Sequence, residues 1–186
     1  MTSLAKQTSI AFSLLCLLLG TPLAQDLTIR DIQVVDPASK QIVRRDLYVH
    51  NGRVSSQPPP SPHRIVLGKG RYLLPGFIDT HTHSWGNPNP GGEDEAFGLH
   101  GTAQRMLFAG VTAFLDLGSP EEKILTARDN QRRNQPLEAD LYAAGPVFMS
   151  DTNSVAGLQR SRRVANTPQE AEEQVAQLYR RRPDVI

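Results

Sequence analysis

The sequence predicts an α/β protein in which a small antiparallel β module precedes strands that alternate with helices. Three observations support this prediction. Residues 26–74 contain several short β-prone runs, and the proline-rich stretch "SSQPPPSP" interrupts them. From Leu74 onward, apolar strand-like runs alternate with helical segments. Alternation at this spacing is typical of βα units that build a parallel sheet.

The first residues have the layout of a secretory signal. Lys6 precedes an apolar run from Ile10 to Leu19, and small residues lead to Ala24. The apolar run is shorter than the roughly 20 residues that a membrane-spanning helix needs. We therefore expect residues 1–24 to be a signal peptide and the mature chain to be exported, to the periplasm or the extracellular space, without a stable membrane span.

Composition excludes several kinds of partner and site. The chain has 20 basic and 19 acidic residues, and its basic runs are not interleaved with aromatic residues, so we expect no nucleic-acid partner. Cys16 is the only cysteine and lies within the predicted signal. The mature chain is therefore expected to have neither a disulfide nor a thiolate metal ligand. No pattern in the sequence indicates an oligomeric state.

The β module is expected over residues 25–73. "LTIRDIQVVD" alternates loosely, and "DLYVHNGRVSS" places Asn51-Gly52 between two short β-prone runs. An Asn-Gly pair in this setting predicts a hairpin with a type I′ turn, because both central residues need a positive φ. After the proline-rich loop, "HRIVLGKGRYLL" resumes the β-prone pattern.

Residues 74–186 are expected to contain three to four βα units. The predicted order is strand "LLPGFIDTHTH", helix "EDEAFGLHGTAQRMLFAG", strand "VTAFLDLG", helix "SPEEKILTARDNQRRNQ" and strand "ADLYAAGPVF". An irregular loop, "MSDTNSVAGLQRSRRVAN", then leads to a last helix. Thr167 is its expected N-cap, with Pro168 at the first helical position and Glu170 completing a capping box. "PDVI" predicts the beginning of a fourth strand.

The pair His81 and His83 is the strongest candidate for chemistry. Residues i and i+2 of a strand point to the same face, so Asp79, His81 and His83 are expected side by side. Two imidazoles can then reach one metal ion, since Zn–N bonds are about 2.0–2.1 Å. Asp79 is the candidate to orient an imidazole by accepting its second N–H. The alternative is that these are polar residues that end a strand without binding a metal.

The same stretch carries a family resemblance. "LLPGFIDTHTH" resembles the P-G-[FL]-I-D-x-H-x-H signature of the metal-dependent amidohydrolase superfamily, and "AGVTAFLDLG" resembles the second-strand segment of its imidazolonepropionase and prolidase-like branch. "VHNGRV" resembles part of that family's small sandwich domain. The resemblance implies the N-terminal part of a (β/α)₈ TIM-type barrel preceded by a small antiparallel β-sandwich module. It also implies one or two divalent metals, commonly zinc, with His81 and His83 as ligands.

The resemblance further implies an activity. Members hydrolyse C–N bonds of non-peptide amides, cyclic amides or small dipeptides with a water that the metal activates. From Leu74 onward the chain has less than half of the roughly 250 residues of a typical barrel. We therefore assign no catalytic residue and expect residues 1–186 alone to be inactive. Two alternatives stay open: a non-catalytic truncated remnant, and a deaminase of the same superfamily.

The remaining candidates are expected to be structural. His50, His63 and His100 are expected in surface or core roles. Asp116 follows the second barrel-like strand, at the end where site residues lie, and we expect it to support the fold.

Overall fold

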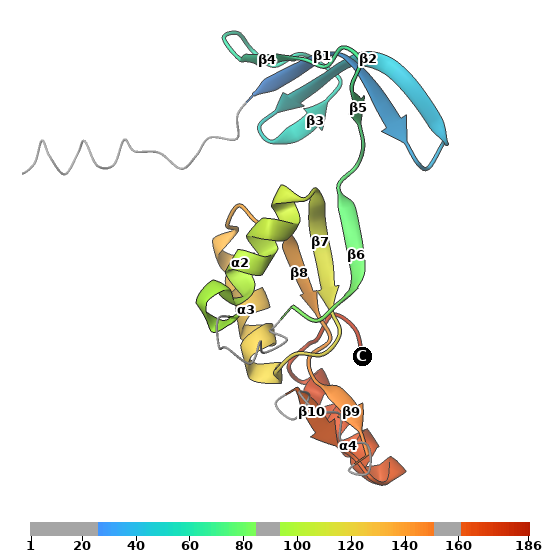
Figure 1. Ribbon diagram of the computed structural model, residues 1–186, viewed down its shortest axis with the longest axis vertical. Coiled ribbons are helices and arrows are strands. Elements are labelled where there is room, and N and C mark those ends of the chain that lie inside the picture. Colours follow the sequence, from blue (N-terminus) through green and yellow to red (C-terminus); the bar gives the residue numbers. More distant parts are fainter. Residues whose placement is uncertain (1–25, 85–93, 151–160) are drawn as a thin grey trace, which may run out of the picture. The chain divides into compact units, whose positions relative to one another are not determined.

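The chain folds as two compact units, divided between Pro75 and Gly76. The computed structural model describes residues 26–84, 94–150 and 161–186, and the predicted signal peptide lies outside them. Figure 1 shows the elements of each unit. No helix in the described residues is both long enough and apolar enough to cross a membrane.

The first unit is a single five-stranded sheet. Its strands are β1 (Leu27–Asp36), β2 (Gln41–His50), β3 (Arg53–Ser55), β4 (Arg64–Leu67) and β5 (Tyr72–Leu73). β2 and β3 form the predicted hairpin, in which Asn51 and Gly52 have φ values of 51° and 73°. A type I′ turn requires a positive φ at both central residues, so these angles confirm the predicted turn.

The prediction of an antiparallel module is wrong for β4 and β5, which pair with β1 in parallel. The proline-rich loop returns the chain to the start of β1, where Arg64 N–H donates to the Asp26 carbonyl at 3.2 Å. A bulge between Ile29 and Ile32, with Asp31 at a φ of 59°, divides β1. β4 pairs with residues 27–30 of β1, and β5 pairs with residues 33–34. The described residues of this unit form no second layer, so the sandwich stays a prediction.

The second unit has a parallel sheet in the strand order β6-β7-β8, and α2 and α3 cover one of its faces (Figure 1). Its elements are β6 (Phe77–Thr82), α2 (Asp94–Phe108), β7 (Val111–Asp116), α3 (Glu121–Asn134), β8 (Asp140–Ala143), β9 (Val147–Met149), β10 (Arg162–Val164) and α4 (Pro168–Tyr179). The predicted alternation of strands and helices from β6 to β8 is confirmed.

The core of the second unit lies between this sheet and its helices. Phe114 of β7 and Leu141 of β8 are paired in register, and both are buried. Ile124 and Leu125 of α3 and Ala103 of α2 pack in the same cluster. The apolar face of each helix therefore covers the apolar face of the sheet, as expected for βα units.

Three predictions for the C-terminal part are wrong. The single strand expected over "ADLYAAGPVF" is two strands, β8 and β9, separated by a turn in which Gly145 has a φ of 93°. β9 is not part of the β6-β7-β8 sheet and pairs instead with β10, which lies in the predicted loop. "PDVI" is not a strand; instead, Asp184 N–H donates to the Ala143 carbonyl at 2.9 Å.

The start of α4 is close to its prediction. Thr167 Oγ1 accepts from Glu170 N–H at 3.2 Å, which confirms Thr167 as the N-cap. Glu170 Oε2 accepts from the backbone N–H of Asn166 at 2.7 Å, one residue earlier than in a standard capping box. Leu178, near the C-terminal end of α4, is buried in the core of the second unit.

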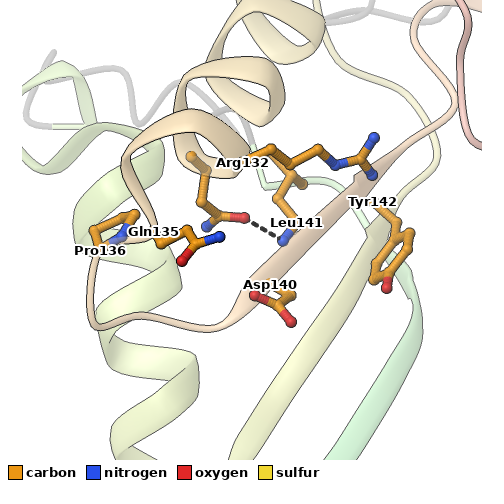
Figure 2. Close-up of a pocket in the computed structure, with 7 residues that line it drawn as sticks. Arg132, Gln135, Pro136, Asp140, Leu141 and Tyr142 are labelled. Carbon is orange, nitrogen blue, oxygen red and sulfur yellow. Dashed lines mark hydrogen bonds between the residues drawn. The ribbon is translucent and has the colours of Figure 1, made fainter. Parts of the chain in front are cut away.

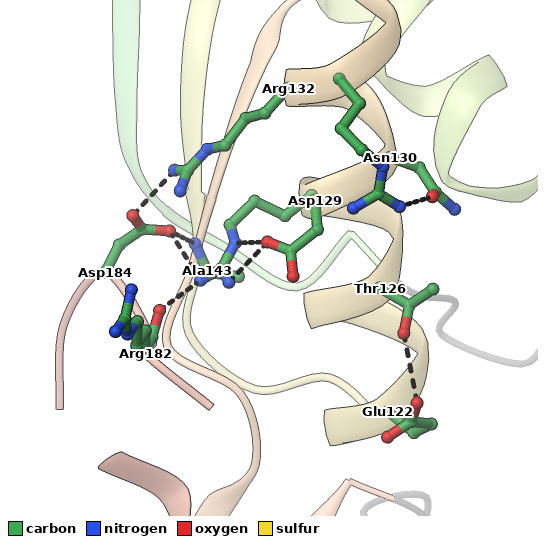
Figure 3. A network of polar contacts seen from close by, with 10 residues as sticks. Glu122, Thr126, Asp129, Asn130, Arg132, Ala143, Arg182 and Asp184 are labelled. Carbon is green, nitrogen blue, oxygen red and sulfur yellow. Dashed lines mark hydrogen bonds and ion pairs between the residues drawn. The ribbon is translucent and has the colours of Figure 1, made fainter. Parts of the chain in front are cut away.

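A polar network holds the segment after α4 against α3 and β8 (Figure 3). The buried Arg128 donates to the Arg182 carbonyl at 2.9 Å and to Asp184 Oδ2 at 3.3 Å. Asp184 also accepts from Arg132 at 2.8 Å and from Ala143 N–H at 2.9 Å. Partial burial raises the pKa of the Asp184 carboxyl, but Arg132, the Ala143 N–H and the charge of Arg128 outweigh it and lower the pKa below its ordinary value.

Candidate metal-binding site

The two candidate metal ligands lie at the C-terminal end of β6. His81 is inside the strand, and His83 is the first residue after it. Both side chains are exposed, their ring centroids are 5.4 Å apart, and their planes make an angle of 74°. The imidazoles are therefore neighbours and accessible from solvent.

This separation fits a shared metal ion. An imidazole nitrogen binds zinc at about 2.0–2.1 Å, which places the ring centre roughly 3 Å from the metal and two ring centres about 5 Å apart at a tetrahedral angle. The observed 5.4 Å is close to this value. In the described residues no group of three or more His, Cys, Asp or Glu side chains could hold a metal. The pair therefore fits part of a site, because a catalytic zinc normally has three protein ligands.

Asp79 lies in β6, two residues before His81. Asp79 pairs with Phe114, and Thr82 pairs with Asp116, so the register shifts between residues 79 and 82. The carboxylate Oδ1 accepts from the backbone N–H of His81 at 3.1 Å. Asp79 thus contacts the His81 main chain. The role of Asp79 in orienting an imidazole stays a prediction.

Asp116 fixes the end of β6 to the end of β7. It is completely buried, and its Oδ2 accepts from Ser84 N–H and Ser84 Oγ at 2.6 Å each and from Ser119 Oγ at 2.7 Å. Its Oδ1 accepts from Gly118 N–H at 3.1 Å. Four donors therefore stabilise the buried carboxylate, and the residue next to His83 is held in place by it. This agrees with the structural role expected for Asp116.

The two histidines of the first unit make local contacts within its sheet. His50 Nδ1 lies 3.0 Å from Asp26 Oδ2 beside the β2–β3 hairpin. His63 Nε2 lies 2.9 Å from Thr28 Oγ1, and His63 Nδ1 donates to the Pro60 carbonyl at 3.1 Å. These contacts join the proline-rich loop and the hairpin to the start of β1.

His100 lies on α2, and its Nδ1 contacts Glu138 Oε2. Its Nε2 is 3.2 Å from Gln104 Nε2, one helical turn away. The ring is largely exposed. His100 thus has the surface role expected for it.

A cavity of about 420 Å³ lies at the start of β8 (Figure 2). Gln131 lines it, accepting from Leu141 N–H at 2.7 Å and donating to the Ala139 carbonyl at 2.9 Å. The Arg132 guanidinium is 5.6 Å from the centre of the Tyr142 ring. Strands β6 and β8 are both parallel to β7, so the cavity lies at the opposite end of the sheet from the histidines. Its polar groups support β8, and we assign no chemistry to it.

Comparison with known proteins identifies the family. Residues 72–183, more than half of the chain, match the amidohydrolase family. The chain belongs to this family. Amidohydrolases are hydrolases that act on C–N bonds, and they generally bind divalent metal ions. The matched residues include both histidines of the candidate site.

Two curated amidohydrolase relatives match over a short stretch. The adenine deaminase of Deinococcus radiodurans is 43% identical over 61 residues, which cover 31% of this chain and 11% of the relative. The dihydroorotase of Endomicrobium trichonymphae is 37% identical over 57 residues, which cover 31% of this chain and 14% of the relative.

Solved amidohydrolase structures match over more of the chain. A putative prolidase from Bifidobacterium longum has a TM-score of 0.69 and 24% identity, covering 87% of this chain and 40% of the prolidase. At this identity the likeness shows the fold. The chain spans less than half of the length of each of these three relatives.

Proposed function

We propose that this chain supplies the first βα units of a (β/α)₈ barrel enzyme in which His81 and His83 bind a divalent metal. Zinc is the metal that we propose first. The observation that carries the proposal is the imidazole pair, 5.4 Å apart at the C-terminal end of a parallel strand, inside the part of the chain that matches the amidohydrolase family. Active sites of such barrels lie at the C-terminal ends of the strands.

The exposed apolar residues of β6 support the proposal that this strand belongs to a barrel. Phe77 and Ile78 are 61% and 68% exposed, although both are large apolar residues in a strand. In the described residues β6 pairs with β7 alone. A barrel would cover this strand with further elements, and the likeness to the prolidase fold agrees with such an arrangement.

The residues of the chain have distinct proposed roles. When bound, the metal supplies Lewis acidity that activates a water for attack on the carbon of a C–N bond. His81 and His83 hold the metal. The Asp79 carboxylate accepts a hydrogen bond from the His81 main-chain N–H. The Asp116 carboxylate accepts one from the N–H of Ser84, the neighbour of His83. These hydrogen bonds hold the main chain at His81 and next to His83.

Two substrate classes are proposed. The first is an amide C–N bond in a cyclic amide or a small dipeptide, which the prolidase and dihydroorotase relatives support. The second is the bond between a ring carbon and its amino group, as in adenine, which the adenine deaminase relative supports. Both classes need attack of water on a carbon that bears nitrogen, so the same histidine pair serves either.

Replacing His81 or His83 with alanine should abolish specific Zn²⁺ or Co²⁺ binding, because each replacement leaves one imidazole at the site. Metal affinity of residues 1–186 is measured by competition with a chromophoric chelator. His100→Ala is the matched control, since His100 is an exposed histidine on α2 that contacts Glu138. Equal affinity in the parent chain and in His83→Ala would contradict the proposal.

Turnover is tested with Zn²⁺ and a panel of Xaa-Pro dipeptides, dihydroorotate and adenine. Residues 1–186 should show negligible turnover, because the described part offers two histidine ligands and no third. A form of the protein that contains all eight strands should turn over one of these substrates and lose that activity on His81→Ala or His83→Ala. Zinc-dependent turnover by the short chain would show that the pair needs no further ligand.

We also propose export, on the basis of the short apolar run and the small residues up to Ala24. Expression in a bacterium with a periplasm, followed by N-terminal sequencing, checks this. A mature N-terminus at Gln25 or Asp26 is the expected result. Soluble protein that retains Met1 in the cytoplasm would refute export.

A further inference from the structure

The His83 ring lies against a glycine of the neighbouring strand end. Gly118 comes two residues after the end of β7, and a Cβ atom at this position would lie 3.1 Å from His83 Nδ1 and 3.3 Å from His83 Cε1. It would also lie 2.7 Å from Val147 Cγ2. Carbon atoms in contact prefer separations of about 3.5–4.0 Å, so any side chain at position 118 would have to displace both neighbours.

The backbone angle at Gly118 does not explain this glycine. Gly52, Gly70, Gly98, Gly110 and Gly145 have positive φ values, a conformation that favours glycine, and Gly118 is not among them. An alanine could adopt the backbone conformation of residue 118. What the position lacks is room, and His83 and Val147 fill the space that a methyl group would need.

Gly118 is also held in place relative to His83. Its N–H donates to Asp116 Oδ1 at 3.1 Å, while Asp116 Oδ2 accepts from Ser84 N–H at 2.6 Å. One buried carboxylate therefore fixes both Gly118 and the residue that follows His83. A shift of Gly118 away from the imidazole would lengthen its hydrogen bond to Asp116.

We infer that Gly118 is a positioning residue for the metal site: its missing side chain leaves the space that lets the His83 imidazole stand beside His81. This inference rests on the proposed role of the two histidines as metal ligands. A methyl group at position 118 would push the His83 ring by a few tenths of an ångström or into another rotamer, and the two imidazoles would no longer point at a common ion.

The test is Co²⁺ titration of residues 1–186, followed by the visible absorption bands of the bound ion and by chelator competition. Gly118→Ala should lower Co²⁺ affinity by about ten- to a hundredfold, the range found when groups that orient metal ligands are changed, and should alter the band positions. Val147→Ala should keep the parent affinity and spectrum, because it removes only the other neighbour.

The double variant Gly118→Ala/Val147→Ala separates the two contacts. With Val147 shortened, the methyl group at position 118 still meets His83, so affinity should stay as low as in Gly118→Ala. Affinity restored to the level of Val147→Ala would overturn the inference, since crowding of Val147 would then be the cause. Parent affinity and an unchanged spectrum in Gly118→Ala would overturn it as well.

Stability of the metal-free chain provides a second, independent test. Gly118→Ala is compared in the parent and in His83→Ala by thermal unfolding, which measures the coupling of the two positions. The methyl group should destabilise the chain less when the imidazole is absent. If the parent shows no histidine-dependent Co²⁺ binding, the proposed function fails. The unfolding cycle still tests whether a side chain at position 118 contacts the His83 ring, and zero coupling between the two positions overturns the inference. The cycle also applies if Gly118→Ala folds poorly.

Discussion

Replacing Phe114 with alanine is expected to destabilise the second unit by about 3–5 kcal/mol, the range for removal of a buried aromatic side chain. Phe114 is completely buried between the β6-β7-β8 sheet and its helices, in contact with the cluster that contains Ile124 and Leu141. Alanine would leave a cavity that these branched side chains can fill only in part. Denaturant unfolding followed by the helical circular dichroism signal measures the effect, because the described helices all belong to this unit.

Phe108 is the matched control for this experiment. It is 96% exposed at the end of α2, so Phe108→Ala removes the same atoms without forming a cavity. Its effect should stay within about 0.5 kcal/mol, as for most surface substitutions. A Phe114→Ala effect no larger than that of Phe108→Ala would mean that the sheet and helices do not pack as described.

The second large effect is expected at Asp116. Asp116→Ala would leave four donors, on Ser84, Gly118 and Ser119, without their buried acceptor. Each unsatisfied buried donor costs about 1–3 kcal/mol, so a loss of about 3 kcal/mol or more is expected in unfolding free energy. Metal affinity should fall as well, because the segment that carries His83 loses its anchor.

Asp36→Ala is the comparison for Asp116. Asp36 accepts from Ala38 N–H at 3.0 Å and from Ser39 Oγ at 2.7 Å in an exposed turn, where water can replace the carboxylate. Its loss should cost much less than the loss of Asp116. Equal effects of the two substitutions would show that solvent reaches Asp116 in solution.

Features that depend on neighbouring residues were predictable from the sequence. The Asn51-Gly52 turn and the Thr167 cap of α4 follow from residues within a few positions of each other, and the structure confirms both. The closeness of the two histidine rings was predictable for the same reason, since they are two residues apart at the end of β6. The role of the pair in metal binding stays a prediction.

Features that depend on distant residues were not predictable in this way. β4 and β5 pair with β1 in parallel because the proline-rich loop returns the chain to the start of β1, and no local pattern encodes that direction. β10 lies in the segment that the sequence predicts as a loop. Its partner β9 falls within the single strand predicted over "ADLYAAGPVF", so no partner for β10 is evident from the sequence. In the sequence, Gly118 is only a glycine two residues after a strand, which is a weak signal without its contact with His83.

The hydrogen bonds and ion pairs of Asp184 make the stability of the second unit depend on whether its carboxyl group is protonated. A carboxyl whose pKa is lower in the folded chain than in the unfolded chain must bind a proton as the chain unfolds in acid. The stability that it contributes is present above about pH 4, the ordinary aspartate value, and is lost as the pH falls through the lower, folded value. Acidification below about pH 4 therefore weakens the contacts by which Arg128 and Arg132 hold the segment after α4.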